Sequence, residues 1–191
     1  MQLNIYNISH PIIKLLSNVI KENKKNEIIS SYYYKNLGLL LMYEILRKHI
    51  TIKKIYIKSI YSIKLINLTN QKRKYIIVTN LLYNYEMLQD IKILLPDIDI
   101  ININCEQINK SKVKINDTII KKIEIFILEK ELKNINILEV IKYFISHYNI
   151  SINHISIISI ISYENILNEL SKKYPKLKVY TTEISYRKNT F

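Results

Sequence analysis

A group of charged residues stands where α/β proteins commonly bind phosphate. A mostly apolar run over residues 123–128 is followed by Glu129, Lys130, Glu131 and Lys133, and then by an amphipathic segment. A strand, a short connection and a helix in this order place backbone N–H groups at a helix N-terminus, where an anion is stabilised. Close approach of the backbone to a phosphate is easiest with glycine, and this connection has none. The pattern therefore predicts the scaffold of a phosphate site without its usual chemistry.

Other residue types that often do chemistry are few and scattered. The single cysteine, Cys105, excludes an internal disulfide and has no local motif of a nucleophile. Glu129 and Glu131 could bind a cation, but their alternation with lysines is more simply explained by a solvated turn. The histidines show neither an H-x-x-x-H pair nor an adjacent acidic pair; they are His10, His49, His147 and His154. We therefore predict no catalytic residue and no metal site.

The chain carries an excess of positive charge. It has 29 lysines and arginines against 16 aspartates and glutamates, which gives a formal net charge of +13 at pH 7. Such an excess favours an anionic partner, and the run Tyr32-Tyr33-Tyr34 could stack on nucleic-acid bases. A bias toward isoleucine, asparagine, lysine and tyrosine, the residues of AT-rich codons, explains both features without a ligand. RNA binding is therefore an alternative hypothesis.

Length and hydropathy predict one folded domain. A chain of 191 residues, 48% of them hydrophobic, is of single-domain size and can bury a full core. The N-terminus has no basic region followed by an apolar run, so no secretory signal is expected. No uncharged apolar stretch reaches the roughly 18 residues of a membrane span. The composition fits a protein made inside an organelle.

The elements that must position these residues follow from the hydrophobic periodicity. One helix is predicted from Pro11 and a second over about 31–48. The second contains Gly38, which costs about 1 kcal/mol in a helix and is best explained by close helix packing. From Tyr75 onward the pattern alternates between strands and helices. The expected strands are 75–81, 97–103, 123–128, 155–161 and 177–184.

This order predicts an α/β fold, a mainly parallel sheet flanked by helices. The helices of the core are expected over about 84–95, 134–147 and 163–173, with Asn134 or Asn136 as a cap of the middle one, and a loop over 106–122. We predict a single domain, 1–191. Its parts are the N-terminal helices in 1–50, a small hairpin in 51–74, the α/β core in 75–184 and a tail in 185–191.

Several short motifs, in the same order and at similar spacing, resemble uracil phosphoribosyltransferase. His10-Pro11-Ile12-Ile13 is similar to the family's His-Pro-Leu-Val opening. Gly38 and the residues around it are similar to V-G-S-L-L-T-Y-E, and Pro175 with Tyr180-Thr181 is similar to H-P-x-x-x-x-Y-T. The likeness covers almost the whole chain up to Ile184. It implies a type I phosphoribosyltransferase fold with a small hood.

The resemblance also implies an ancestral reaction and the place of its phosphate loop. The family transfers ribose 5-phosphate from phosphoribosyl pyrophosphate (PRPP) to uracil with magnesium, and its loop resembles D-P-M-L-A-T-G-G-S. The matching positions here are Leu128, Glu129, Lys130, Glu131, Leu132, Lys133, Asn134, Ile135 and Asn136. No residue of the motif is retained, and two glutamates would repel a phosphate at close range.

Two further ligand-binding segments of the family are also changed. Its P-I-L-R-A-G turn, which contacts pyrophosphate, falls on residues 79–84, with Leu82 in place of the arginine and Asn84 in place of the glycine. The glycine-rich uracil segment after the Y-T strand has no counterpart. We therefore expect a corner filled by bulky and acidic side chains, no substrate-binding residues and no cofactor.

These changes predict a uracil phosphoribosyltransferase homologue that has lost catalysis, a pseudoenzyme kept as a structural subunit, a homodimer or a partner of another protein. One alternative is a residual or rebuilt PRPP site that still makes UMP from uracil, with nearby cations at Lys112, Lys114, Lys121 and Lys122. RNA binding is the second. Composition and resemblance together place the expected protein in the plastid (chloroplast) stroma, encoded in the organelle.

Overall fold

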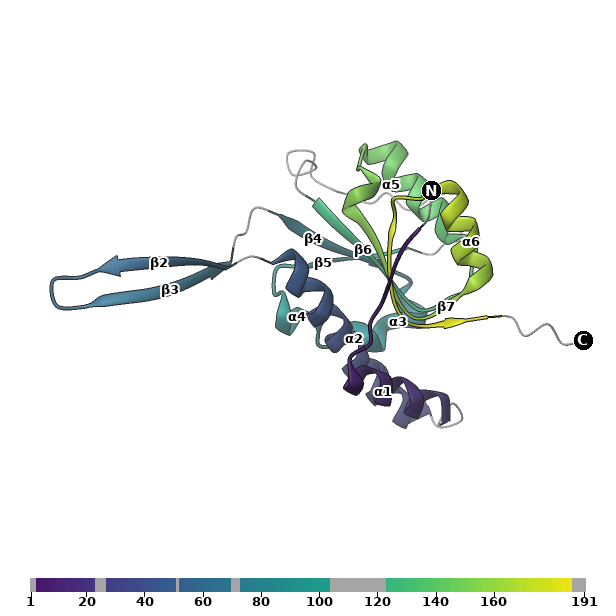
Figure 1. Cartoon of the computed structure of the whole chain (residues 1–191), viewed down its shortest axis with the longest axis horizontal. Coiled ribbons are helices and arrows are strands. Elements are labelled where there is room, and N and C mark those ends of the chain that lie inside the picture. The colour runs from purple at the N-terminus through teal and green to yellow at the C-terminus, as the bar shows by residue number, and fades with distance from the viewer. Residues whose placement is uncertain (1–2, 23–26, 51, 70–72, 104–122, 187–191) are drawn as a thin grey trace, which may run out of the picture.

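The fold is built on one parallel sheet, seen in a computed structural model that describes residues 3–22, 27–50, 52–69, 73–103 and 123–186 (Figure 1). Within these residues, six parallel strands lie in the order β1-β8-β7-β6-β4-β5. Their bounds are β1 Asn4–Asn7, β4 Lys74–Thr79, β5 Asp99–Asn102, β6 Ile123–Leu132, β7 Ile155–Tyr163 and β8 Lys178–Ser185. The predicted α/β class is confirmed.

Helices cover both faces of the sheet (Figure 1). On one face lie α1 Pro11–Glu22, α2 Glu27–His49, α3 Leu81–Leu88 and α4 Ile91–Leu94. On the other lie α5 Ile137–Tyr148 and α6 Glu164–Lys173, and a short 3-10 turn, η3 Ile152–His154, leads into β7. Strand β6 serves both faces, because successive side chains point in opposite directions. Ile125 and Ile127 pack under α5 and α6, whereas Phe126 and Leu128 pack under the other helices.

Gly38 lies where α2 packs closely against α3. A Cβ atom at this position would lie 2.1 Å from the carbonyl oxygen of Met87 and 2.7 Å from its Cα. Both are backbone atoms, which cannot turn aside as a side chain can. The expectation that close helix packing explains this glycine is confirmed.

A hairpin projects from the body of the molecule (Figure 1). Strands β2 Ile52–Lys58 and β3 Ile63–Thr69 pair antiparallel and form a separate sheet, as the sequence predicts. The turn is closed by the Ser59 N–H, which donates to the Ser62 carbonyl at 2.8 Å. Its tip residues Ile60 and Tyr61 are 91% and 96% exposed, so the hairpin offers apolar side chains to solvent.

Several predicted bounds are wrong. Strand β1 is missed, because four exposed residues show no periodicity and the strand exists only by pairing with β8. Helix α2 begins at Glu27 rather than near residue 31. Strand β6 continues to Leu132 instead of ending at Leu128, and α5 begins at Ile137 rather than at Asn134. The predicted loop 106–122 lies outside the described residues. Among the described helices, none combines the length and apolar character that crossing a bilayer requires.

Candidate functional site

The predicted phosphate loop is largely a strand. Residues 128–132 belong to β6, and its pairing with β7 continues through Glu129 with Ser159, Glu131 with Ile161 and Leu132 with Ser162. Pairing with β4 on the other side stops at Ile127, so this end of β6 is bordered by one strand only. An extended backbone paired in this way does not curl around a ligand. The charged side chains on this strand are stabilised by residues of α3: Glu129 bonds Asn84, and Lys130 pairs with Glu86.

Asn84 is the residue that joins the two predicted segments. It is 1% exposed, and its Nδ2 donates to Glu129 Oε2 at 2.9 Å and to the Asn80 carbonyl at 3.2 Å. Its Oδ1 accepts the Lys130 backbone N–H at 2.9 Å. The sequence indicates only that a glycine is missing here. The structure shows that the amide which replaces it bonds the start of α3 to the end of β6.

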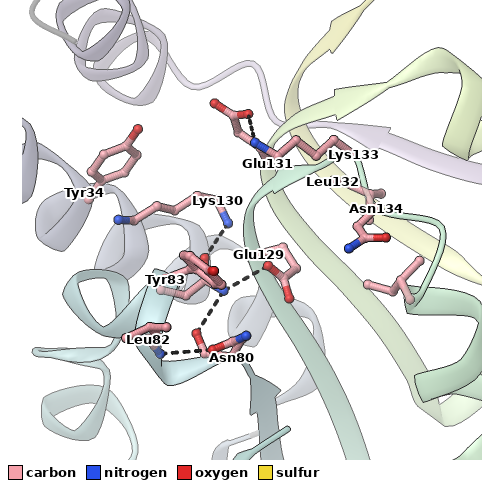
Figure 2. Close-up of a pocket in the computed structure, with 12 residues that line it drawn as sticks. Tyr34, Asn80, Leu82, Tyr83, Glu129, Lys130, Glu131, Leu132, Lys133 and Asn134 are labelled. Carbon is pink, nitrogen blue, oxygen red and sulfur yellow. Dashed lines mark hydrogen bonds and ion pairs between the residues drawn. The ribbon is translucent and has the colours of Figure 1, made fainter. Parts of the chain in front are cut away.

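Lys130 points away from Glu129, toward α2 and α3 (Figure 2). Its Nζ lies 2.7 Å from Glu86 Oε2 and 4.3 Å from the centre of the Tyr34 ring. Glu86 Oε2 is buried and accepts no well-aligned hydrogen bond in the described part of the chain, so the contact is an ion pair. Burial raises the pKa of Tyr34, and the charges of Glu131 and Glu86 add to the rise. The Lys130 ammonium group therefore has two partners, the Glu86 carboxylate and the Tyr34 ring.

Glu129 differs from Glu86 and Glu131 in its partner: it accepts a hydrogen bond from a neutral amide, whereas the other two pair with lysines. Burial raises its pKa, and the hydrogen bond from Asn84 acts in the opposite direction. Among the described residues no cation lies within ion-pair distance of it, whereas Glu131 is 3.3 Å from Lys133 Nζ. Glu129 and Lys130 are both half-buried. The interpretation of these charges as a solvated turn is therefore wrong.

A cavity of about 570 Å³ lies at this corner. Its lining contains Leu82 and Asn84 from the first predicted segment and residues 129–134 from the second. Asn80 and Tyr83 of the first segment also line it (Figure 2). Tyr34 from α2 and Ile137 from α5 complete the lining. The expectation that bulky side chains fill the corner is wrong, since they line a hollow instead.

The remaining predicted positions lie outside this lining. Leu128 is fully buried in the core, and its carbonyl accepts the Thr79 hydroxyl at 2.6 Å. Ile135 is exposed. Asn136 precedes α5 without a side-chain cap, and its N–H donates to Asn134 Oδ1 at 3.1 Å. Asn134 therefore provides the turn that leads into the helix.

A second polar cluster lies at the amino end of β6. Glu124 is 3% exposed, and its Oε1 accepts Arg73 Nη1 at 2.7 Å and lies 2.9 Å from His154 Nδ1. These residues are far apart in the sequence, and no motif links them. Within the described residues no three or more His, Cys, Asp or Glu side chains gather as metal ligands. Cys105 and the predicted cations Lys112, Lys114, Lys121 and Lys122 lie outside the described residues.

The other histidines have ordinary structural environments. The His10 carbonyl accepts the Lys14 N–H at 3.1 Å at the start of α1, as expected for a residue that begins a helix. His147 lies in the last turn of α5, where its Nδ1 is 3.3 Å from the Tyr143 carbonyl. Burial lowers the pKa of His49, whose ring meets Phe126 edge-on. None of these three lies in the cavity at the end of β6.

A parallel sheet covered by helices on both faces, with a hollow at the carboxyl ends of its strands, defines a doubly wound α/β protein of the kind that binds ligands at this edge, and it is consistent with a phosphoribosyltransferase-like fold. A solved structure of a protein from Aquifex aeolicus has the same fold, with a TM-score of 0.73 and 20% sequence identity over 97% of this chain and 89% of that chain. The family model described as uracil phosphoribosyltransferase matches residues 7–190. This chain belongs to the uracil phosphoribosyltransferase family.

Two relatives from red algae support this membership. A protein of Porphyra purpurea named uracil phosphoribosyltransferase homolog is 30% identical over 185 residues, which cover 97% of this chain and 90% of the relative. A protein of Pyropia yezoensis with the same name is 28% identical over the same shares of the two chains. The resemblance stated from the sequence is confirmed.

Proposed function

We propose that this homologue no longer transfers phosphoribosyl groups and is retained as a structural or protein-binding subunit. The observation that carries the proposal is that residues 128–132 form a strand. In the family, the matching positions belong to a glycine-containing phosphate loop. Leu128, in the position of the acid that faces the ribose, is buried in the core. The Lys130 N–H is already bonded to Asn84. Neither group is free for a ligand.

The charges of the corner also oppose a phosphate. A phosphate about 4 Å from a carboxylate would be repelled by roughly 1–4 kcal/mol per pair of unit charges, depending on solvent access. Glu129 and Glu131 both line the cavity. Lys130 is neutralised by Glu86, and Leu82 supplies no guanidinium in place of the family's arginine. We therefore propose that neither PRPP nor magnesium binds here.

A role in an assembly is supported by the hairpin. An isolated two-stranded hairpin is marginally stable in water, and exposed apolar side chains often mark contact surfaces. Ile57, Ile60, Tyr61 and Leu65 are all exposed in this way. The partner would be a second copy of the chain or another protein. The red-algal relatives and the AT-biased composition support a plastid location, which is part of the same proposal.

The test is a turnover assay. The purified chain is incubated with uracil, PRPP and magnesium, and UMP is separated from labelled uracil by chromatography. We expect no UMP above a blank without protein, while an active uracil phosphoribosyltransferase added to a parallel tube shows that the assay works. UMP formation that rises in proportion to the amount of this chain would overturn the proposal.

One observation favours a second candidate, a site that still binds PRPP or UMP. The cavity of about 570 Å³ lies between the two segments that the family uses for these ligands, and its volume is typical of small-molecule sites. Isothermal titration with PRPP and with UMP separates the two candidates. If neither PRPP nor UMP gives a heat of binding at millimolar concentration, the second candidate is excluded.

A further inference from the structure

We propose that the cavity at the end of β6 binds a small organic cation, an ammonium or guanidinium group on a short aliphatic stem, with Glu129 as its counter-charge. This inference rests on the proposed loss of PRPP binding, because a pyrophosphate would need the opposite charge in the same space. The site would then have kept its position in the fold while the sign of its ligand changed.

Glu129 provides the charge that the cation would neutralise. Asn84, a neutral amide, bonds one of its two carboxylate oxygens, and no cation among the described residues pairs with it. A partly desolvated carboxylate without a counter-ion is destabilised, and an ammonium or guanidinium at hydrogen-bond distance would remove that cost. The raised pKa of Glu129, caused by burial, agrees with an uncompensated charge.

The neighbouring lysines do not compete for Glu129. Lys130 extends toward Tyr34, away from Glu129, and Glu131 lies beside Lys133 (Figure 2). Lys130 is paired with Glu86 at 2.7 Å, and Lys133 with Glu131 at 3.3 Å. The second pair is solvent-exposed and therefore weak, so Glu131 can also turn toward a bound cation.

The rim of the cavity suits an aliphatic stem. Leu82 is 78% exposed and Tyr83 is also exposed, both from the start of α3. Methylene groups cover apolar surface of this kind while a charged end group reaches a polar partner. The rest of the molecule carries a formal excess of positive charge. Long-range attraction therefore cannot draw a cation to this protein, and binding must come from local contacts.

The experiment is isothermal titration of the full chain with agmatine, which carries a guanidinium and an ammonium group on a four-carbon stem, at physiological ionic strength. We expect saturable binding to the wild-type chain. Glu129→Gln keeps an oxygen for Asn84 but loses the charge, and we expect it to weaken binding by about tenfold or more. Glu169→Gln removes an acid from α6, outside the cavity, and should bind as the wild type does.

Two further arms sharpen the test. Inorganic pyrophosphate should not displace agmatine from the wild-type chain, a measurement that needs no variant to fold. N-acetyl-arginine amide carries the same guanidinium on a peptide unit, and we expect it to bind more weakly than agmatine; tighter binding would overturn the assignment to a small free cation.

No saturable binding of agmatine to the wild-type chain, or equal binding to Glu129→Gln, would overturn the inference, as would displacement by pyrophosphate. Failure of the inference is distinguishable from failure of the proposed function. If agmatine does not bind and no UMP forms, only the cation site is wrong. If UMP forms, the proposed function itself is wrong.

Discussion

Replacing Gly38 by alanine tests the packing of α2 on α3. Alanine is the better helix former by about 1 kcal/mol, so the helix itself gains stability from the change. Against this gain, the new Cβ would lie 2.1 Å from the Met87 carbonyl oxygen, 2.7 Å from its Cα and 2.8 Å from its carbonyl carbon. All three contacts are with backbone atoms, so the two helices must move apart.

The magnitude follows from these opposing terms. Overpacking a core typically costs about 1–3 kcal/mol and occasionally more, and contacts this short with backbone belong at the upper end or beyond. Movement of α3 would also disturb Met87 and Leu88, which are buried against the sheet. After the helix gain is subtracted, we expect a net loss of about 2 kcal/mol. For a domain of this size that loss lowers Tm by roughly 4–8 °C.

The assay is urea unfolding followed by far-ultraviolet circular dichroism. Asn18→Ala, at an exposed position of α1, raises helix propensity without a steric clash and serves as the control. We expect the control to change the free energy of unfolding by no more than about 0.5 kcal/mol. If Gly38→Ala proved as stable as the wild type or more stable, the inferred contact between α2 and α3 would be refuted.

Two other substitutions test the polar clusters by the same assay. Arg73→Met leaves the buried Glu124 carboxylate with His154 alone. We expect the free energy of unfolding to fall by about 1–2 kcal/mol, less than for a fully buried pair because Arg73 is half-exposed. As the control, Arg47→Met breaks a surface pair with Glu44 and should cost no more than about 0.5 kcal/mol. A loss no larger at Arg73 than at Arg47 would contradict this. Asn84→Ala leaves the Lys130 N–H and Glu129 without their shared partner and should cost about 2–3 kcal/mol. A change as small as that of Asn18→Ala would show that Asn84 does not join α3 to β6.

The central strands could be predicted from the sequence because their physics is local. Residues 123–128 are apolar except for Glu124, and residues 155–161 are apolar except for two serines, as a strand covered on both faces requires. The single glycine could also be interpreted, since a helix tolerates glycine best where another backbone comes close. The fold class and the family motifs therefore agree with the structure.

The details of the corner could not be predicted, because they depend on partners distant in the sequence. Charged residues after Leu128 suggest a turn, yet Glu129 bonds Asn84, which is 45 positions away, and Lys130 pairs with Glu86. The same holds for Glu124, whose partner Arg73 is 51 positions away. Strand β1 is another case, because its exposed residues form a strand only where β8 offers an edge.

The pairing of β1 with β8 has a consequence for how the fold is completed. Asn4 is aligned with Lys178 and Asn7 with Thr181, so the edge that β1 needs is supplied by residues far away in the sequence. Contacts between residues so distant in sequence form late and slow the approach to the native state. On the ribosome, β1 would wait until β8 has been synthesised before it could join the sheet.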